Sequence, residues 1–592
     1  MPYEWSMYPT TDIDPKIIEL SKGDGLQARL LVNRGVTNPN LAKYFFDLTG
    51  LSFTSALEIP EMDKAFARVK EAIDEKQKIV VFGDYDVDGT SSVALLYRAF
   101  GFLGIKIDYY IPNRFHEGYG LNKEAVYKIK NNLKADLLIT CDCGISNFDE
   151  VDYANTLGLD VIITDHHSIP QNPPPSIANC NPKTLNAEHP LHFLPGVGVA
   201  YELACLILDE FLDDSEAYKK DLLDLVALGM VADLAPLKSE NRFLTLRGLE
   251  VLSKTTKVGL RELLKISGVA VDPDAEHIGF GLAPRINSVG RLNDAQTAVR
   301  LMITDDEDEA VELAQELDLS NRERQVLCTE IFDSAFMKIQ EKPEILKNNV
   351  IVLADASWHH GVVGIVASRL IEQFHLPVFM IAVEGEMAKA SVRSIDVNDL
   401  DLFKEMQEIQ KKTNLFEKFG GHQMAAGFSV KSSNLEALID AINEHFKEKL
   451  KDLNLNKKVK IDTALKLTEV SETLVSRINK LAPFGIANPS PKFVIGPLLI
   501  ARTKSLGKDG KHLKLFVQEP NNNRLVEAVI WNRAEEFLDE FGVGDSLVFA
   551  FSPRINDFMS MKSIQLDIKD WHKPEDLDMD IFFARFRKKV EA

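Results

Sequence analysis

Short runs of apolar residues alternate with amphipathic stretches over the first 240 residues of the chain. Residues 79–82, 135–141 and 159–164 are the clearest of these runs, and each has the length and composition of a strand buried on both faces. Residues 65–77 repeat apolar positions every three or four residues, which predicts an amphipathic helix before the first run. Strands and helices in this order predict βαβ units that build a parallel sheet.

The pattern changes further along the chain. Residues 306–340 repeat apolar positions at helical spacing over a length that predicts a long connecting helix. Residues 457–573 hold short strands of alternating pattern, typical of a small antiparallel barrel such as an OB-fold. We therefore expect an α/β multidomain chain with an N-terminal helical segment (1–57), a parallel-sheet domain (58–240), a helical connector (241–345), a second α/β domain (346–452), an OB-fold β-barrel (453–573) and a tail (574–592).

The composition restricts the class of protein and its compartment. With 592 residues and 45% hydrophobic content, the chain is long enough for several domains with cores of their own. No apolar stretch reaches the roughly 18 residues that a membrane span needs, and the five cysteines lack the paired spacing of zinc sites. We therefore expect a cytoplasmic protein with reduced thiols and no membrane segment. The net charge of −21 argues against a uniformly basic surface, so nucleic acid would bind at local positive patches.

Three carboxylates follow the first apolar run at two-residue intervals. Side chains alternate in an extended segment, so Asp84, Asp86 and Asp88 are expected to face one way at the carboxyl end of the strand. Gly89 then permits a tight turn, and residues 90–92 are suited to cap a following helix. A solvated acidic loop is the alternative, but three like charges beside a buried strand repel unless a cation offsets them. A calcium-binding EF-hand loop is disfavoured because its twelfth position lacks the required glutamate.

Residues of metal-ligand type end the following apolar segments. Asp142 follows the second run, the third run ends in Asp165, His166 and His167, and Asp233 follows an apolar helix-like segment. A single aspartate there is more often a cap or turn residue, and a single histidine pair is more often on the surface. Because parallel strands bring their carboxyl ends into one crevice, these residues together predict one site. Carboxylates with imidazoles and without thiolates suit Mn²⁺ or Mg²⁺ better than Zn²⁺.

The motifs DYDVDGTSS, CDCGIS, TDHH and VADLAP have the order and spacing of the DHH phosphoesterase superfamily, which the chain resembles. The resemblance implies that residues 58–240 are a DHH catalytic domain that hydrolyses phosphodiesters with two divalent ions, Mn²⁺ or Mg²⁺. It implies that Asp142 bridges the ions, that Asp165 orients the imidazoles, and that His167 is a ligand or a phosphate contact. Asp142, His166 and His167 would be the catalytic residues. The metal ligands that it implies are Asp84, Asp86, Asp88, Asp142, His166 and Asp233.

Candidate phosphate-binding residues lie outside these motifs. Arg114 stands in a loop rich in proline and glycine, and two further arginines lie among small residues at 281–296, where the backbone is suited to approach a ligand closely. A surface arginine, a helix cap or an ion pair between lobes is the alternative. The glycine pair in FGGHQMAAGFSV resembles the DHH-associated substrate domain, expected over 346–452. The predicted phosphate- or DNA-binding residues are Arg114, Arg285, Arg291, Ser391, Arg393, Gly420, Gly421 and His422.

The C-terminal barrel carries a local excess of positive charge. Residues 500–515 hold five lysines or arginines against one acid, Asp509, and Phe516 and Trp531 are nearby as stacking surfaces. This predicts a groove for single-stranded nucleic acid, the alternative being a solvated hairpin with aromatic residues in the core. The residues predicted to line the groove are Arg502, Lys504, Lys508, Lys511 and Lys514.

The stretches WHHGVVGIVASRL and LAPFGIANPSPK resemble the RecJ family of nucleases within this superfamily, and the resemblance covers nearly the whole chain. It implies a single-stranded-DNA-specific exonuclease that degrades from 5′ to 3′ and releases 5′ mononucleotides in DNA repair and recombination. It also implies a monomer that works with a helicase and a single-strand-binding protein.

A physical reason for this polarity lies in the second α/β domain. If Ser391, Arg393 and residues 420–422 form a pocket for a terminal phosphate, only a free 5′ end would place the next phosphodiester on the metal ions. One alternative function is a phosphodiesterase for nanoRNA or cyclic dinucleotides, which would not need the barrel. Another is a non-catalytic DNA-binding relative, against which the intact acids at every motif argue.

Overall fold

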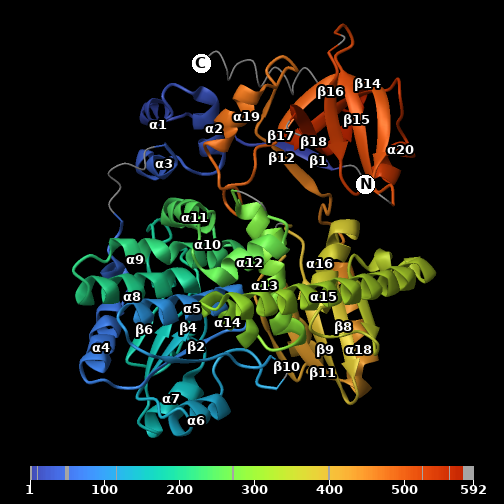
Figure 1. Cartoon of the computed structure of the whole chain (residues 1–592). Coiled ribbons are helices and arrows are strands. Elements are labelled where there is room, and N and C mark those ends of the chain that lie inside the picture. Colours follow the sequence, from blue (N-terminus) through green and yellow to red (C-terminus); the bar gives the residue numbers. More distant parts are fainter. Residues whose placement is uncertain are drawn as a thin grey trace. The chain divides into compact units, whose positions relative to one another are not determined.

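The chain forms two compact units in a computed structural model (Figure 1). The structure describes residues 3–9, 11–46, 53–114, 116–269, 272–397, 400–507, 509–522, 524–558 and 561–577. The first unit comprises Met1–Ala283, Ala298–Val311 and Lys458–Ala592, and the second comprises Pro284–Thr297 and Glu312–Lys457. The chain passes between the units within three consecutive helices, α13 (Ala283–Leu292), α14 (Gln296–Ile303) and α15 (Glu307–Glu341), and again between Lys457 and Lys458. With its 35 residues, α15 confirms the predicted long connecting helix.

The first unit contains the predicted parallel sheet. Its strands are, in spatial order, β3 (Asp108–Tyr110), β2 (Ile79–Gly83), β4 (Leu137–Cys141), β5 (Asp160–Thr164) and β6 (Ala178–Cys180). Every residue of β2 and β4 is buried, because α6 (Lys123–Asn131) and α7 (Phe148–Thr156) cover one face and α5 (Val87–Phe102) and α8 (Gly196–Phe211) the other (Figure 1). The continuous apolar runs follow from this double coverage.

Further helices lie between β1 and α13 in this unit. They are η1 (Ala56–Glu58), α4 (Met62–Asp74), η2 (Pro182–Thr184), α9 (Glu216–Asp221), α10 (Leu223–Ala232), α11 (Ser239–Leu252), α12 (Val258–Ile266) and the π-helix η3 (His277–Leu282). Among the described residues, every helix is too short or too polar to cross a lipid bilayer.

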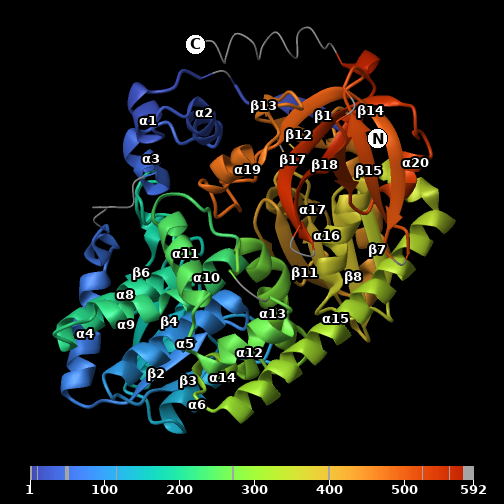
Figure 2. The same cartoon turned by 45° about the horizontal axis from the view of Figure 1, so that its top comes forward.

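The N-terminal segment shares a hydrophobic core with the C-terminal domain. Strand β1 (Glu4–Met7) pairs in parallel with β12 (Lys458–Ile461). Apolar side chains of α1 (Pro15–Leu20), α2 (Gly25–Asn33) and α3 (Pro39–Phe46) pack in one cluster with those of α19 (Glu472–Asn479) and the barrel strands. Figures 1 and 2 show these three helices beside α19. The two ends of the chain therefore stabilise each other.

The C-terminal domain is built from six strands in the order β13, β14, β15, β16, β18 and β17, and β14 also pairs with β17. Most strand pairs are antiparallel, as the sequence predicts, but β13–β14 and β16–β18 are parallel. Strand β17 follows β16 in sequence but pairs with the other side of β18. Strands β16 and β18 are therefore direct neighbours in space, and they run parallel. The bounds are β13 (Thr463–Ala464), β14 (Phe493–Leu506), β15 (His512–Gln518), β16 (Val526–Ile530), α20 (Ala534–Leu538), β17 (Ser546–Phe558), β18 (Met561–His572) and η6 (Pro574–Asp576).

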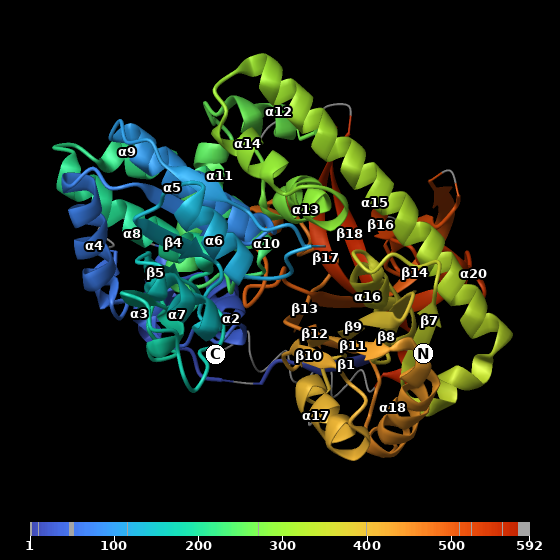
Figure 3. The same cartoon turned by 90° about the horizontal axis from the view of Figure 1, so that it is seen from below.

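The second unit is organised around a mixed sheet. In spatial order its strands are β10 (Lys418–Gly421), β11 (Ala425–Lys431), β9 (Met387–Arg393), β8 (Val378–Glu384) and β7 (Ile351–Asp355), and only β7–β8 is parallel. One face packs on α15 and α16 (Val363–Phe374), and the other on α17 (Leu402–Thr413) and α18 (Leu435–Lys449), which lie side by side in Figure 3. The short helices η4 (Pro343–Asn348) and η5 (Ser432–Asn434) precede β7 and α18.

A buried ion pair joins the N-terminal helices to the C-terminal domain and gives a test of this arrangement. Arg34 Nη1 lies 2.8 Å from Asp462 Oδ1, and the two side chains are 1% and 2% exposed. We predict that Arg34→Met lowers the free energy of unfolding by about 3 kcal/mol or more, because it leaves a carboxylate buried without its cation. Urea unfolding followed by circular dichroism measures this change.

An exposed ion pair provides the control. Arg261 pairs with Glu307 at 2.8 Å, with side chains 48% and 77% exposed. Arg261→Met should cost no more than about 1 kcal/mol because solvent screens this pair. Equal effects of the two substitutions would contradict a stabilising role for the buried pair.

Candidate metal centre

The three aspartates after β2 lie in the turn that leads into α5. Asp86 is the N-cap of this helix, and its carboxylate accepts hydrogen bonds from the N–H groups of Asp88 (2.9 Å) and Gly89 (3.1 Å). Because an aspartate satisfies two unpaired N–H groups here, the helix begins at Val87. The predicted extended alternation was therefore wrong, and residues 90–92 lie inside the helix instead of capping it.

Close packing of helices around this turn buries two of the carboxylates. A Cβ on Gly89 would lie 2.5 Å from the carbonyl oxygen of Asp84, so glycine is needed where α5 meets the strand. Asp84 is 2% and Asp88 is 1% exposed. The Asp88 carboxylate accepts hydrogen bonds from the first N–H groups of α8, at Gly196 (2.6 Å) and Val197 (2.9 Å). This helix N-terminus partly offsets the cost of burying the negative charge.

Asp142 lies at the end of β4 in a left-handed backbone conformation, with φ of 60°. Such a conformation is uncommon for a residue other than glycine and is held here by tertiary contacts. The N–H of Asp142 donates to the carbonyl of Thr164 on the neighbouring strand (2.9 Å), and a Cβ on Gly196 would lie 2.6 Å from the Asp142 Cβ. Asp142 Oδ1 lies 3.0 Å from Nε2 of His166. These contacts fix the carboxylate at the centre of the cluster.

Asp165 forms hydrogen bonds with both residues of the histidine pair. Its Oδ1 accepts hydrogen bonds from the N–H groups of His166 (2.7 Å) and His167 (3.0 Å) and lies 2.8 Å from Nδ1 of the His167 ring. Burial raises the pKa of Asp165, but the hydrogen bond and charge of His167 outweigh it, and the net shift is downward. Burial lowers the pKa of His167, but the hydrogen bond and charge of Asp165 raise it by more, and the resulting pKa is about 9. Nδ1 of His167 also lies 3.8 Å from Oδ1 of Asp142.

The structure brings these residues together in three overlapping groups. Each residue of a group offers one ligand atom, and these atoms all lie within 4.8 Å of one another. His166 and Asp142 each belong to two groups. The overlap is the arrangement that a pair of neighbouring cations would need. The groups are Asp84, Asp86 and Asp142; Asp88, His166 and Asp233; and Asp142, His166 and His167.

Like charges dominate the electrostatics of this cluster. Burial, followed by the neighbouring carboxylates, raises the pKa of Asp88 and of Asp233 to about 7. The same two causes raise the pKa of Asp84 and of Asp142 well above the usual range. A bound divalent cation would remove the cause of these shifts by stabilising the ionised forms.

The donor set fits Mn²⁺ or Mg²⁺. Asp84 Oδ1 is buried and makes no hydrogen bond in the described structure, which is the expected state of an oxygen that faces an ion. The ligand atoms are carboxylate oxygens and imidazole nitrogens. Burial raises the pKa of the nearby Cys141 thiol to about 12, so this sulfur is a poor ligand. The cluster is therefore positioned to bind hard divalent ions.

Other polar side chains beside the cluster include one that the sequence predicted and two that it missed. The Arg114 guanidinium lies 5.0 Å from the ring centre of Tyr85, and its charge acts to lower the pKa of Asp84. The Tyr119 hydroxyl lies 3.3 Å from Nε2 of His167, and the charge of Lys183 acts to lower the pKa of Asp233. Tyr119 lies in a loop and Lys183 in the three-residue helix η2, so no periodic pattern marks either residue.

Three predicted phosphate donors meet at the start of α16 in the second unit. Arg393 Nη1 donates to Ser391 Oγ (3.1 Å), and a Cβ on Gly364 would lie 2.6 Å from that oxygen. Arg291 Nη1 donates to the carbonyl of Gly361, two residues before the helix (3.3 Å). The structure therefore brings Arg291, Ser391 and Arg393 to one helix N-terminus, where N–H groups favour anions.

The other predicted residues of the second unit lie in different surroundings. Arg285 Nε is 2.9 Å from Asp318 Oδ1, an ion pair within this unit. Gly420 and Gly421 end the edge strand β10, which β11 separates from β9. The exposed His422 follows, and its Nδ1 accepts a hydrogen bond from the N–H of Met424 (3.3 Å).

The basic residues of the C-terminal domain are partly paired with other groups. Arg502 lies over the Phe516 ring at 4.7 Å, and Lys504 is opposite Lys514 in the β14–β15 register. Lys514 pairs with Glu527 (2.9 Å), and Lys511 pairs with Asp509 (3.0 Å). Trp531 is 48% exposed, and Lys508 lies outside the described residues. The predicted groove therefore has less unbalanced positive charge than the sequence indicated.

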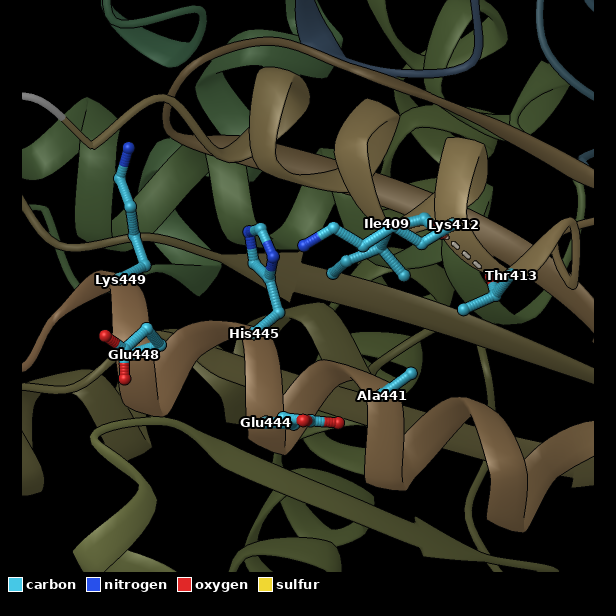
Figure 4. A pocket seen from close by; sticks show the side chains of 8 residues that line it. All are labelled: Ile409, Lys412, Thr413, Ala441, Glu444, His445, Glu448 and Lys449. Carbon is cyan, nitrogen blue, oxygen red and sulfur yellow. Dashed lines mark hydrogen bonds between the residues drawn. The ribbon is translucent and has the colours of Figure 1, made fainter.

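A separate pocket of about 490 Å³ lies between α17 and α18 (Figure 4). Glu405 accepts hydrogen bonds from His445 (2.8 Å) and from Lys449 (2.9 Å) at its side. None of the predicted site residues lines this pocket, and it contributes nothing to the metal centre. Its lining residues are Ile409, Lys412, Thr413, Ala441, Glu444, His445, Glu448 and Lys449.

Sequence models of three domain families match the chain. The DHH family, N-terminal domain, matches residues 78–230, the DHHA1 domain matches residues 347–448, and the RecJ OB domain matches residues 461–570. Together with the cluster of acids and histidines, these matches define a DHH-type protein that carries a DHHA1 and an OB domain.

Individual proteins make the relationship more specific. The chain is 36% identical to the single-stranded-DNA-specific exonuclease RecJ of Bacillus subtilis, over 92% of this chain and 67% of that protein, and 35% identical to that of Salmonella typhimurium, over 87% and 90%. The chain belongs to the RecJ family. A crystal structure of Thermus thermophilus RecJ with Mn²⁺ superposes with a TM-score of 0.79 at 26% identity, over 97% of this chain and 80% of that one. The structure with Mg²⁺ superposes with a TM-score of 0.75 at 25% identity, over 97% of this chain and 78% of that one.

Removal of the central carboxylate tests the metal centre. We predict that Asp142→Ala lowers the affinity for Mn²⁺ by about 100-fold or more, because Asp142 belongs to two of the three ligand groups. Isothermal titration calorimetry of the full chain measures this affinity. The control Asp149→Ala changes an exposed acid at the start of α7 and should leave the affinity for Mn²⁺ unchanged. Equal affinity in wild type and Asp142→Ala would contradict the assignment.

The raised pKa values predict how metal binding depends on pH. Asp88 and Asp233, with pKa values of about 7, are mostly protonated at pH 6 and mostly ionised at pH 8. A cation must displace these protons, so affinity for Mn²⁺ should rise by at least about tenfold from pH 6 to pH 8. Calorimetry at both values should also show protons released at pH 6. An affinity for Mn²⁺ that stays constant from pH 6 to pH 8 would contradict the raised pKa values of Asp88 and Asp233.

Proposed function

We propose that this chain is a single-stranded-DNA-specific exonuclease that hydrolyses phosphodiesters at the carboxylate–histidine cluster of its first unit. The observation that carries the proposal is the convergence of the acids that follow β2, β4 and α10 with the histidines that follow β5, at the carboxyl edge of a DHH-type sheet. Similarity to RecJ exonucleases over most of the chain supports the substrate class.

The site residues have distinct roles in this proposal. Two divalent cations would be held by Asp84, Asp86, Asp88, Asp142, His166 and Asp233, of which Asp142 belongs to two of the three ligand groups. Such a pair of ions supplies Lewis-acid stabilisation of phosphodiester hydrolysis. Asp165 orients the His167 ring through Nδ1, and this ring would contact an ion or a phosphate oxygen. Arg114 lies beside Asp84 and contributes positive charge for the substrate phosphates.

The polarity of the reaction is assigned to the second unit. Ser391, Arg393 and Arg291 at the N-terminus of α16 bind a terminal phosphate, with the 420–422 loop as a further part of the pocket. Capture of a 5′ phosphate leads to 5′→3′ degradation and to release of 5′ mononucleotides. The ion pair of Arg285 with Asp318 supports a structural role for that arginine.

The C-terminal domain and outside partners complete the proposal. Arg502, Lys504, Phe516 and Trp531 bind the single strand on the outer face of the barrel domain. The protein acts in the cytoplasm as a monomer, in DNA repair and recombination. Because it accepts only single strands, it depends on a helicase to open duplexes and on a single-strand-binding protein to keep them open.

Digestion of end-labelled DNA tests this function. A long single strand carrying a 5′ phosphate should release labelled mononucleotides first from a 5′ label, and a 3′ label should remain on progressively shorter strands. A matched duplex should resist digestion. Asp142→Ala should lose detectable hydrolysis, at least about 1,000-fold, and still bind the strand.

Three outcomes of this experiment would contradict the proposal. If the 3′ label were released first, the proposed 5′→3′ polarity would be wrong. Faster cleavage of a dinucleotide than of the long strand would favour a phosphodiesterase of nanoRNA or cyclic dinucleotides. Activity that persists in Asp142→Ala would remove the two-metal site from the mechanism.

A further inference from the structure

Phe280 is held in an unusual environment for an aromatic residue. Its side chain is 84% exposed, and among the described residues no large apolar side chain is more exposed. Single exposed hydrophobic residues are common on protein surfaces, so exposure alone assigns no role. The backbone around Phe280 is what makes it distinctive.

The backbone below Phe280 is anchored while the space beside the ring is open. Phe280 lies within the π-helix η3, whose neighbouring residues Ile278 and Leu282 are 0% and 1% exposed. A Cβ on Gly279 would meet nothing within 4 Å, and one on Gly281 would meet nothing closer than 3.9 Å. Segments of π-helix are rare and occur frequently at functional sites. A buried base and two flanking glycines therefore present the aromatic ring to solvent.

The segment that carries Phe280 contacts both the lobe of the metal centre and the C-terminal domain within the first unit. The π-helix η3 packs against α10, the helix whose C-cap is Asp233, a residue of the metal cluster. Glu276, immediately before η3, pairs with Arg554 on β17 of the C-terminal domain at 2.8 Å. The same short segment thus contacts the helix that ends at the site and a strand of the barrel domain.

We propose that Phe280 is a stacking platform for a nucleobase of the single strand, between the cleavage site and the barrel domain. The inference rests on the proposed function. Stacking on an aromatic ring suits a substrate of any sequence, because every base offers a flat π-face. The ring is uncharged, so its contribution does not depend on salt, unlike contacts to phosphates. An unpaired strand exposes its bases for this contact, whereas a duplex keeps them stacked within itself.

Binding of a 5′-phosphorylated single strand to the full chain without added metal tests the proposal. Fluorescence anisotropy should show that Phe280→Ala weakens binding about tenfold, with the same salt dependence as wild type. Phe280→Trp should bind within about twofold of wild type because it keeps an aromatic face. Tyr127→Ala, which removes another exposed aromatic residue, on α6, is the matched control and should bind as wild type.

Phe280→Leu separates stacking from packing against another part of the protein. Leucine fills an apolar contact but offers no ring, so it should bind as weakly as Phe280→Ala. Wild-type affinity in Phe280→Leu, or in Phe280→Ala, would overturn the stacking role while the proposed function stands. Failure of the wild-type chain to bind or degrade single-stranded DNA would overturn the proposed function itself.

Discussion

The mutual repulsion of buried carboxylates is the constraint on which the first unit depends. Asp84, Asp88 and Asp142 are each no more than 2% exposed, and Asp233 lies in the same cluster. Parallel strands bring these charges to one edge, and no arrangement of the apolar core relieves the repulsion. The fold offsets part of it with the N–H groups of α8 and leaves the remainder to bound cations. Metal binding and local stability are therefore coupled in this lobe.

The elements of the sheet could be predicted because buried parallel strands have a direct sequence signature. Each of β2, β4 and β5 appears as a continuous apolar run followed at once by Asp or His, and that order is enough to place the site at the carboxyl edge. The geometry within the turn could not be predicted in the same way. Asp86 can continue a strand or cap a helix, and only its hydrogen bonds to Asp88 and Gly89 decide between these conformations.

Tertiary contacts account for the features that the sequence did not reveal. Tyr119 approaches His167 from a loop, and Lys183 approaches the cluster from η2, so neither belongs to a periodic element. The pairing of β1 with β12 joins residues near opposite ends of the chain, which no local pattern specifies. Spacing alone also could not show that Arg285 pairs with Asp318 while Arg291 and Arg393 lie at the start of α16. Phe280 belongs to no motif in the sequence, and only its exposure in the structure draws attention to it.

The most direct test of the account is the position of Mn²⁺ in a crystal of this chain soaked with that ion. Anomalous scattering recorded at the manganese edge locates each ion independently of the protein atoms. The account predicts two neighbouring peaks within the cluster, with the Asp142 carboxylate in contact with both. A single peak, peaks outside the cluster, or two ions that Asp142 does not contact would contradict the two-metal site.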